Sequence, residues 1–223
     1  MAGGGPGPSC CYDDAFDARE ARALQRSYRR NGPGKTTRAL AAALAPDGAA
    51  GLTVIDVGAG VGALHHLLLS GGAAAAVDVD ASGPYLEVAR EEAVWRGFAE
   101  RVTFHHGDFV GLAAAIPGAD LVGLNRVVCC YFDASALIAE AARHAGRRLG
   151  VVLPPDGRLG RAFIALANVW QWLSRSTFRV YAHRHETVIV AARAGGLELA
   201  AGERLGFIWR MLVFERPATQ PGG

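Results

Sequence analysis

Apolar runs alternate with amphipathic stretches over most of the chain, and this alternation predicts the order of strands and helices. Continuous apolar runs, typical of strands buried on both faces of a sheet, predict strands at 53–57, 74–79, 101–105, 119–124 and 149–153. Apolar positions at helical spacing predict helices between them, at 61–69, 83–97 and 134–146. Strands that alternate with helices indicate an α/β fold with a parallel sheet covered on both faces.

The two ends of the chain follow other patterns. Two helices are expected before the first strand, at 13–30 and from Thr36 or Thr37 to Leu44, with a glycine-proline break between them. After Pro154-Pro155 the pattern predicts helices at 162–173 and 186–194 and strands at 197–203 and 207–215. A turn at Gly206 joins these two strands, so the sheet is expected to end in an antiparallel pair.

The length of the chain suits a single domain, and its net charge bears on the class of partner. A chain of 223 residues suits one domain, and a formal net charge of +2 gives no reason to expect nucleic acid or a membrane surface as partner. We expect a flexible N-terminus at 1–12 and one domain at 13–217. That domain divides into N-terminal helices at 13–50, a cofactor-binding core at 51–153, and a substrate-side insertion with a terminal hairpin at 154–217. The absence of a secretion signal or a long apolar run favours a cytoplasmic location.

The four cysteines form two adjacent pairs, Cys10-Cys11 and Cys129-Cys130. Neighbouring cysteines rarely form a disulfide with each other, so reduced thiols are expected. Structural zinc sites usually space their cysteines as C-x₂-C, which neither pair does. No metal is therefore predicted.

The most informative stretch is VIDVGAGVG at 54–62, where a strand enters a glycine-rich turn that opens a helix. Gly58 and Gly60 fit a dinucleotide fingerprint only weakly. Asp56 stands two residues before Gly58, where a carboxylate would repel a pyrophosphate but could hold a cationic amino group. An alternative is that Asp56 simply caps the turn.

Two further strands end in acidic residues. Asp80 lies 22 residues after Gly58, the distance at which a carboxylate takes ribose hydroxyls, although it could instead cap the following helix. Asp108 precedes Phe109, so an acceptor for an adenine amino group would stand beside a ring that covers the base. Taken alone, Asp108 could also be a solvated turn residue. Together the three acids form a cradle for a cationic adenosine ligand.

On these residues the chain resembles the class I S-adenosylmethionine-dependent methyltransferases over about 35–153. The resemblance implies a Rossmann-like, seven-stranded sheet with S-adenosyl-L-methionine as cofactor. It also implies that the loop with Asp56, Gly58 and Gly60 faces the methionine part. By the same resemblance Asp80 with Ala81 binds the ribose, and Asp108 with Phe109 binds the adenine.

The run NRVVCCY at 125–131 forms a second group. In the family, residues just past this strand face the methyl group, which implies cofactor contacts for Asn125 and Arg126. With Lys35-Thr36-Thr37, the run is distantly similar to the magnesium-protoporphyrin O-methyltransferases and related small-molecule enzymes, although Arg126 and Cys130 stand where an acid and a histidine are expected. Lys35 and Tyr28 are expected to form a lid over the cofactor or, alternatively, only to fix the turn between the first two helices.

Methyl transfer needs a positioned acceptor and, for some acceptors, a general base. Tyr131, Tyr28 and His183 are the predicted catalytic residues. His183 and His185 could share one face of a strand as metal ligands would, but no third ligand is spaced to suit, so an unliganded surface pair is expected. Trp170 and Trp172 in the insertion favour a flat or apolar small-molecule acceptor. We therefore expect a small-molecule methyltransferase of biosynthesis, acting at oxygen. The alternatives are transfer to nitrogen, a methyltransferase fold that binds the cofactor for other chemistry, and an NAD(P)-dependent reductase; the oligomeric state is left open.

Overall fold

The computed structural model describes residues 17–173 and 179–217. The expected flexible N-terminus and the Cys10-Cys11 pair lie outside this part. Seven strands form one sheet in the order β3-β2-β1-β4-β5-β7-β6. The strands are β1 (Thr53–Val57), β2 (Ala75–Asp80), β3 (Val102–His106), β4 (Ala119–Asn125), β5 (Ala145–Leu153), β6 (Glu198–Leu205) and β7 (Trp209–Glu215). The first five strands pair in parallel, and β7 runs antiparallel to both β5 and β6, as the pattern predicted.

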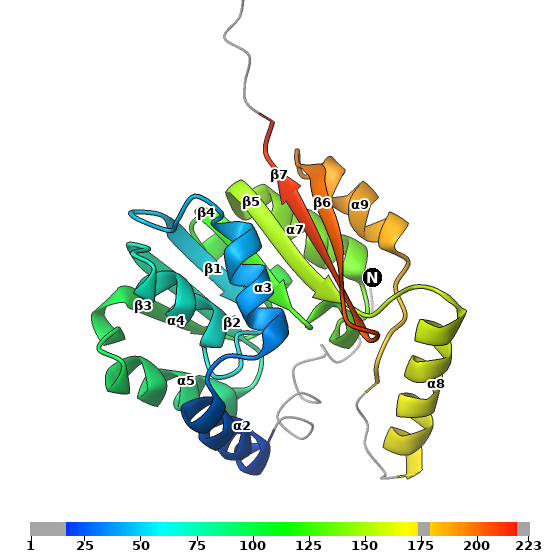
Figure 1. Cartoon of the computed structure of the whole chain (residues 1–223), viewed down its shortest axis with the longest axis horizontal. Coiled ribbons are helices and arrows are strands. Elements are labelled where there is room, and N and C mark those ends of the chain that lie inside the picture. The colour runs from blue at the N-terminus through cyan, green and yellow to red at the C-terminus, as the bar shows by residue number, and fades with distance from the viewer. Residues whose placement is uncertain (1–16, 174–178, 218–223) are drawn as a thin grey trace, which may run out of the picture.

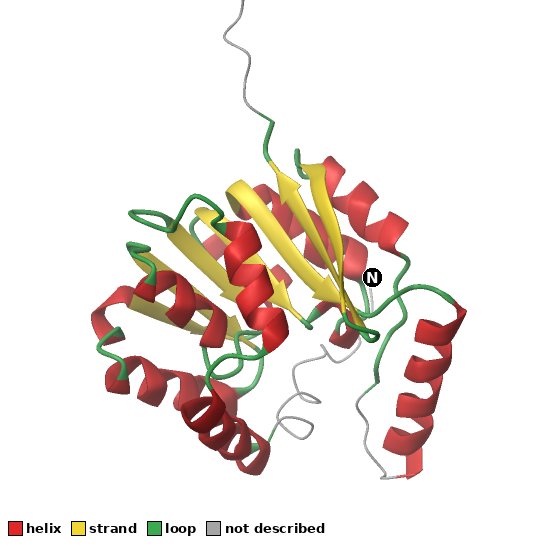
Figure 2. Cartoon of the chain, in the orientation of Figure 1, coloured by secondary structure: helices red, strands yellow, loops and turns green. Residues whose placement is uncertain are grey.

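Helices cover both faces of this sheet (Figures 1 and 2). They are α2 (Ala18–Asn31), α3 (Lys35–Leu44), α4 (Ala63–Ser70), α5 (Gly83–Trp95), α6 (Phe109–Leu112), α7 (Ala134–His144), α8 (Arg158–Leu173) and α9 (His185–Ala194). In Figure 1, α3 and α4 lie in front of the sheet, while α7 lies behind it. The N-terminal α2 packs near α5, and α8 projects from the body. Within the described residues, no helix has the length and apolar character needed to span a bilayer.

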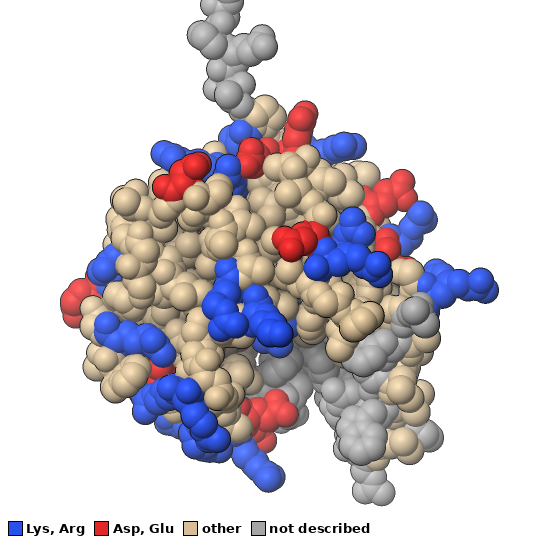
Figure 3. All heavy atoms as spheres, viewed as in Figure 1, with Lys and Arg blue, Asp and Glu red and all other residues tan. Residues whose placement is uncertain are grey.

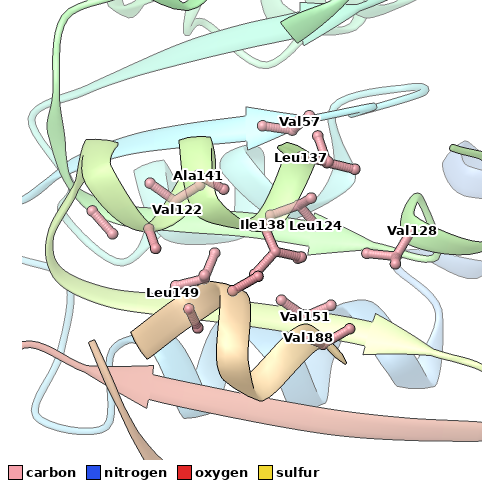
Figure 4. Close-up of a cluster of buried hydrophobic side chains, with 14 of the residues drawn as sticks. Val57, Val122, Leu124, Val128, Leu137, Ile138, Ala141, Leu149, Val151 and Val188 are labelled. Carbon is pink, nitrogen blue, oxygen red and sulfur yellow. The ribbon is translucent and has the colours of Figure 1, made fainter. Parts of the chain in front are cut away.

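A core between the sheet and the helices α7 and α9 holds the strands in place (Figure 4). Val122 and Leu124 on β4, Ile138 on α7 and Val151 on β5 are each 0% exposed. A continuous apolar strand presents such residues to both faces, which is why the run at 119–124 is buried throughout. This packing fixes the carboxyl ends of β1, β2 and β4 along one edge, the place where open α/β sheets bind ligands.

Tertiary pairing moves several predicted boundaries. β5 begins at Ala145 rather than 149, because Ala145 pairs with Ala119 of β4. Arg148 then pairs with Glu215 of β7 in the sheet register and in an ion pair of 2.6 Å. His183 and His185 do not share a strand: His183 lies in irregular chain and His185 opens α9. Alternation of polar and apolar residues over so few positions does not specify a strand without a partner to pair with.

One buried carboxyl on the sheet has no polar partner. Asp78 on β2 is the register neighbour of Asp56 on β1 and is 0% exposed. Neither of its oxygens has a hydrogen-bond partner within the described residues. Burial, followed by the charges of Asp80 and Asp56, raises the pKa of Asp78 well above its usual range. Because Asp78 ionises at lower pH in the unfolded chain than in the folded protein, its contribution to the free energy of unfolding is highest below the unfolded pKa of about 3.9. That contribution falls as pH rises from there toward the raised pKa of Asp78.

Asp78→Asn is therefore expected to stabilise the protein relative to the wild type by an amount that grows with pH. The growth is at most about 1.4 kcal/mol per pH unit above roughly pH 4, because the amide cannot ionise. Urea denaturation of both proteins at about pH 4.5, 6 and 7.5 measures the difference in free energy of unfolding. The same difference at all three pH values would contradict this account of Asp78.

Candidate cofactor and acceptor site

The glycine-rich turn between β1 and α4 needs glycine for conformation and for space. Gly58, Gly60 and Gly62 have φ angles of 62°, 61° and 78°, in the left-handed region that glycine adopts at low cost. A Cβ at position 58 would lie 2.6 Å from Cγ2 of Val127, whereas at position 60 the nearest atoms belong to Tyr85 at 3.7 Å. The turn can therefore bring its backbone close to a ligand.

Gly58→Ala is expected to destabilise the fold by about 1–3 kcal/mol through strain and the clash with Val127, and to abolish ligand binding at the turn. Gly51→Ala is the matched control, because Gly51 also has a positive φ of 73° but open space around its Cβ. The control should cost only about 1 kcal/mol. Thermal denaturation measures both changes, and equal losses would show that the contact with Val127 carries no weight.

Asp56 is hydrogen-bonded to the helix that follows the turn. Its Oδ2 accepts hydrogen bonds from the backbone N–H of His65 at 3.2 Å and from Nδ1 of the same residue at 3.0 Å. The side chain is 1% exposed and lies at the N-terminal turn of α4. A carboxylate thus occupies the positive end of the helix, the position that a pyrophosphate takes in dinucleotide-binding folds.

Asp80 at the end of β2 is tied to the same turn. Its Oδ2 accepts from the N–H of Gly60 and its Oδ1 from the N–H of Ser82, each at 2.9 Å. Burial raises the pKa of Asp80 to about 6, against the lowering effect of these two hydrogen bonds. An ionised carboxylate has further lone pairs, so Asp80 can also accept from ligand hydroxyls.

Asp108 and Tyr131 meet although 23 residues separate them. The Tyr131 hydroxyl donates to Oδ2 of Asp108 at 3.1 Å, and the same oxygen accepts from the N–H of Gly111 at 3.2 Å. Asp108 thereby caps the short helix α6, whose first residue, Phe109, is buried in the core. This pairing places a phenol beside a carboxylate in the site.

The end of β4 carries a polar anchor and a strained residue. Asn125 donates from Nδ2 to the buried Oγ1 of Thr37 on α3 at 2.9 Å, while its Oδ1 is buried without a partner among the described residues. Arg126 has a φ of 66°, the one positive φ of a described non-glycine residue. Its guanidinium lies 5.8 Å from the ring of Trp209. An unpaired buried acceptor and a left-handed arginine at one strand end are typical of a functional site.

These groups line a cavity of about 530 Å³ at the carboxyl edge of the sheet. Most of the predicted site residues share its wall, namely Gly58, Gly60, Asp80, Ala81, Asp108, Phe109, Asn125, Arg126 and Tyr131. Its remaining wall is largely apolar and includes Pro154, Ile164, Val180 and Trp209. The side chains of Trp170 and Trp172 lie outside the described residues.

A second hollow of about 920 Å³ adjoins the cavity beneath α2 and α3. It shares Gly58, Gly60, Asn125 and Arg126 with the cavity and adds Tyr28, Lys35 and Asp56. Figure 3 shows several basic side chains on this face of the molecule. Besides Arg126, the basic residues that line the hollow are Lys35, Arg38 and Arg204.

Two of the predicted catalytic residues lie away from the cavity. Tyr28 is 5% exposed, lies under the guanidinium of Arg96 at 4.1 Å and has its pKa raised to about 12 by burial. His183 lies behind Tyr131, with Nε2 2.8 Å from the carbonyl oxygen of Tyr131. That nitrogen must carry a proton to donate to the carbonyl, so His183 is placed to position Tyr131 rather than to accept a proton through Nε2.

Several site residues had no distinctive sequence signal. Thr37 belongs to the Lys-Thr-Thr motif, which does not indicate a contact with Asn125. In the fold, its hydroxyl accepts a hydrogen bond from Asn125, 88 positions away in the sequence. Leu24 and Trp209 line both the cavity and the second hollow. An isolated apolar residue in a helix or strand looks the same whether it faces the core or a ligand, so only the fold identifies these two.

Comparisons with known proteins agree with this geometry. Residues 54–147 match a family model described as a methyltransferase domain. The structure is similar to the magnesium protoporphyrin IX methyltransferase of Synechocystis with bound SAH, with 24% identity, a TM-score of 0.71, and coverage of 92% of this chain and 97% of that one. An O-methyltransferase family protein of Burkholderia thailandensis has 19% identity and a TM-score of 0.71 over 92% of this chain and 62% of its own.

The fold is also similar to that of a 4+2 cyclase, with 16% identity, a TM-score of 0.62 and coverage of 82% of each chain. Among curated proteins, no sequence matches significantly. The glycine-rich turn and the acidic strand ends fall within the residues that the methyltransferase family model matches. Residues 54–147 thus match a methyltransferase domain, and the chain has the fold of the class I methyltransferases.

Proposed function

We propose that the protein binds S-adenosylmethionine in the cavity and transfers its methyl group to an oxygen atom of a small molecule. One observation carries most of this proposal. Asp80 joins the end of β2 to the N–H of Gly60, and Asn125, whose buried Oδ1 has no partner among the described residues, lines the same cavity from β4. Hydroxyl donors and a cationic amino group are the ligand parts that these two acceptors would suit.

The residues fit this cofactor better than a dinucleotide. Asp56 already occupies the N-terminal turn of α4, where a pyrophosphate would need to bind. Asp56, Asp80 and Asp108 all lie at or just after the carboxyl ends of their strands. A ligand that carries a sulfonium and an ammonium group is attracted by these carboxylates, where a pyrophosphate would be repelled. The reductase alternative is therefore disfavoured on electrostatic grounds.

Each residue then has a proposed role. Asp80, with Ala81 beside it, accepts from the ribose hydroxyls, and Phe109 adjoins the adenine, while Asp108, which accepts from the Tyr131 hydroxyl, serves the proton transfer. Asn125 accepts from the ammonium group, while Lys35 and Arg126 are the cations available to the carboxylate from the second hollow. Bound S-adenosylmethionine supplies an electrophilic methyl group; the protein supplies position and the removal of a proton.

Tyr131 is the proposed proton acceptor. Its hydroxyl already donates to Asp108, so it can take a proton from an acceptor hydroxyl while passing its own to the carboxylate. The apolar wall formed by Pro154, Ile164 and Val180 favours an apolar body for the acceptor. The resemblance to small-molecule O-methyltransferases supports oxygen as the acceptor atom, with nitrogen as the alternative.

The test is transfer of label from S-[methyl-³H]adenosylmethionine to a panel of phenols, carboxylic acids and amines. The proposal predicts labelled products among the hydroxyl or carboxyl compounds and release of S-adenosylhomocysteine in equal amount. Labelling of amines alone would favour N-methylation. The same fold also occurs in a cyclase. If the protein binds the cofactor but transfers label to none of the acceptor classes, the cofactor serves other chemistry.

A further inference from the structure

Two adjacent thiols in the cavity wall have no part in the proposed methyl transfer. Cys129 and Cys130 lie on the turn η3 (Val128–Cys130) that follows β4, and both line the cavity. Their sulfurs are 3.8 Å apart. The carbonyl oxygen of Arg126 lies 3.6 Å from Sγ of Cys129 and 3.7 Å from Sγ of Cys130. Both sulfurs therefore lie on the same side of the turn.

This geometry suits one atom held between the sulfurs better than a bond between them. Sequence neighbours have Cα atoms about 3.8 Å apart, below the roughly 4.4 Å at which disulfides usually begin. At 3.8 Å the two sulfurs are in hydrogen-bonding contact, close enough for one atom to bond to both after small rotations of the two side chains.

The surroundings disfavour a structural metal ion as that atom. Zinc sites in proteins need about four ligands, with three from the protein even in open sites. Over residues 17–173 and 179–217, no group of three or more histidine, cysteine or acidic side chains could hold a metal ion. The ligand that fits needs two sulfurs from the protein and brings its own remaining substituent.

We propose that Cys129 and Cys130 form a chelating site for trivalent organic arsenicals. An arsenic atom of this class bonds to two thiolates and keeps one carbon substituent. The apolar cavity wall at Pro154, Ile164 and Val180 offers that substituent a place to pack. The hydrogen bond from Cys130 lowers the pKa of the Cys129 thiol, which favours Cys129 as the first nucleophile.

The binding step balances without an oxidant. With an arsine oxide, two As–S bonds form and the arsenic–oxygen bond breaks. The oxygen leaves as water with the two thiol protons, and arsenic stays trivalent. The second bond forms within the complex, so the affinity of the pair should exceed that of one thiol by about 10²-fold or more.

The probe is phenylarsine oxide, added to the full chain and followed by intact-protein mass spectrometry. Because the sequence has four cysteines, the double variant Cys10→Ser/Cys11→Ser serves as the background. This background variant is expected to bind one equivalent of phenylarsine oxide. Dimercaptopropanol should release the bound arsenical, whereas 2-mercaptoethanol at the same thiol concentration should not. In that background, Cys129→Ser and Cys130→Ser should each weaken binding by about 10²-fold or more. Circular dichroism checks that both variants fold.

The proposal is overturned if the background variant binds no equivalent, or if either single-thiol variant that folds keeps full affinity. The inference that the bound arsenical blocks the acceptor end of the cavity rests on the proposed function, whereas chelation does not. Chelation without any binding of S-adenosylhomocysteine would leave the thiol site standing and count against the proposed function. Binding of S-adenosylhomocysteine without chelation would do the opposite.

Discussion

Tyr131→Phe is expected to lower kcat for methyl transfer by about 10²-fold or more, while the Kd for S-adenosylhomocysteine changes little. The phenol lies 3.1 Å from Asp108 and lines the cavity, so its removal breaks the path by which an acceptor proton would reach the carboxylate. The ring remains, and with it the packing. Single-turnover kinetics with the labelled cofactor, together with calorimetry, separate the two quantities.

Tyr181→Phe is the matched control for this measurement. Tyr181 lies near Cys129 through its backbone N–H, at 2.7 Å from the carbonyl, but its side chain is 37% exposed and outside the cavity wall. Its variant should retain wild-type kcat. Equal rates for Tyr131→Phe and the wild type would return Tyr131 to a packing role and leave the reaction to proximity alone.

Asp80→Ala is expected to weaken cofactor binding by roughly 1–3 kcal/mol, about 5- to 150-fold in Kd. The change removes the acceptors proposed for the ribose and also the hydrogen bond that holds the N–H of Gly60. Asp120→Ala is the control, because Asp120 likewise accepts from a backbone N–H, that of Thr53 at 2.9 Å, but at the other edge of the sheet. The control should lower stability and leave affinity unchanged.

The pH dependence of binding separates the charge of Asp80 from its shape. With a pKa of about 6, the carboxyl is ionised above that value and accepts from hydroxyls; as pH falls through about 6 it becomes protonated and affinity should fall. Asp80→Asn keeps the shape and should bind weakly but without this pH dependence. A wild-type affinity that stays constant from about pH 5 to 8 would remove Asp80 from the ribose site.

Much of the fold follows from the sequence because a parallel sheet buried on both faces leaves long apolar runs. Strands β1, β2 and β4 match their predicted spans to within one residue for this reason. Side-chain partners are a different matter. The contacts of Asp56 with His65 and of Tyr131 with Asp108 depend on how helices and turns pack, which no local pattern encodes. The positive φ of Arg126 likewise follows from the turn after β4 rather than from its residue type.

The most direct test of the central claim is calorimetric titration of the protein with S-adenosylmethionine, S-adenosylhomocysteine, NADH and NADPH. We expect micromolar binding of the two adenosyl ligands, about −8 kcal/mol, and no binding of either nicotinamide cofactor. A Kd about 5- to 150-fold weaker in Asp80→Ala, with no such change in Asp120→Ala, would support a ligand site in the cavity. Binding of a nicotinamide cofactor alone would contradict the electrostatic argument from Asp56 and the proposed function with it.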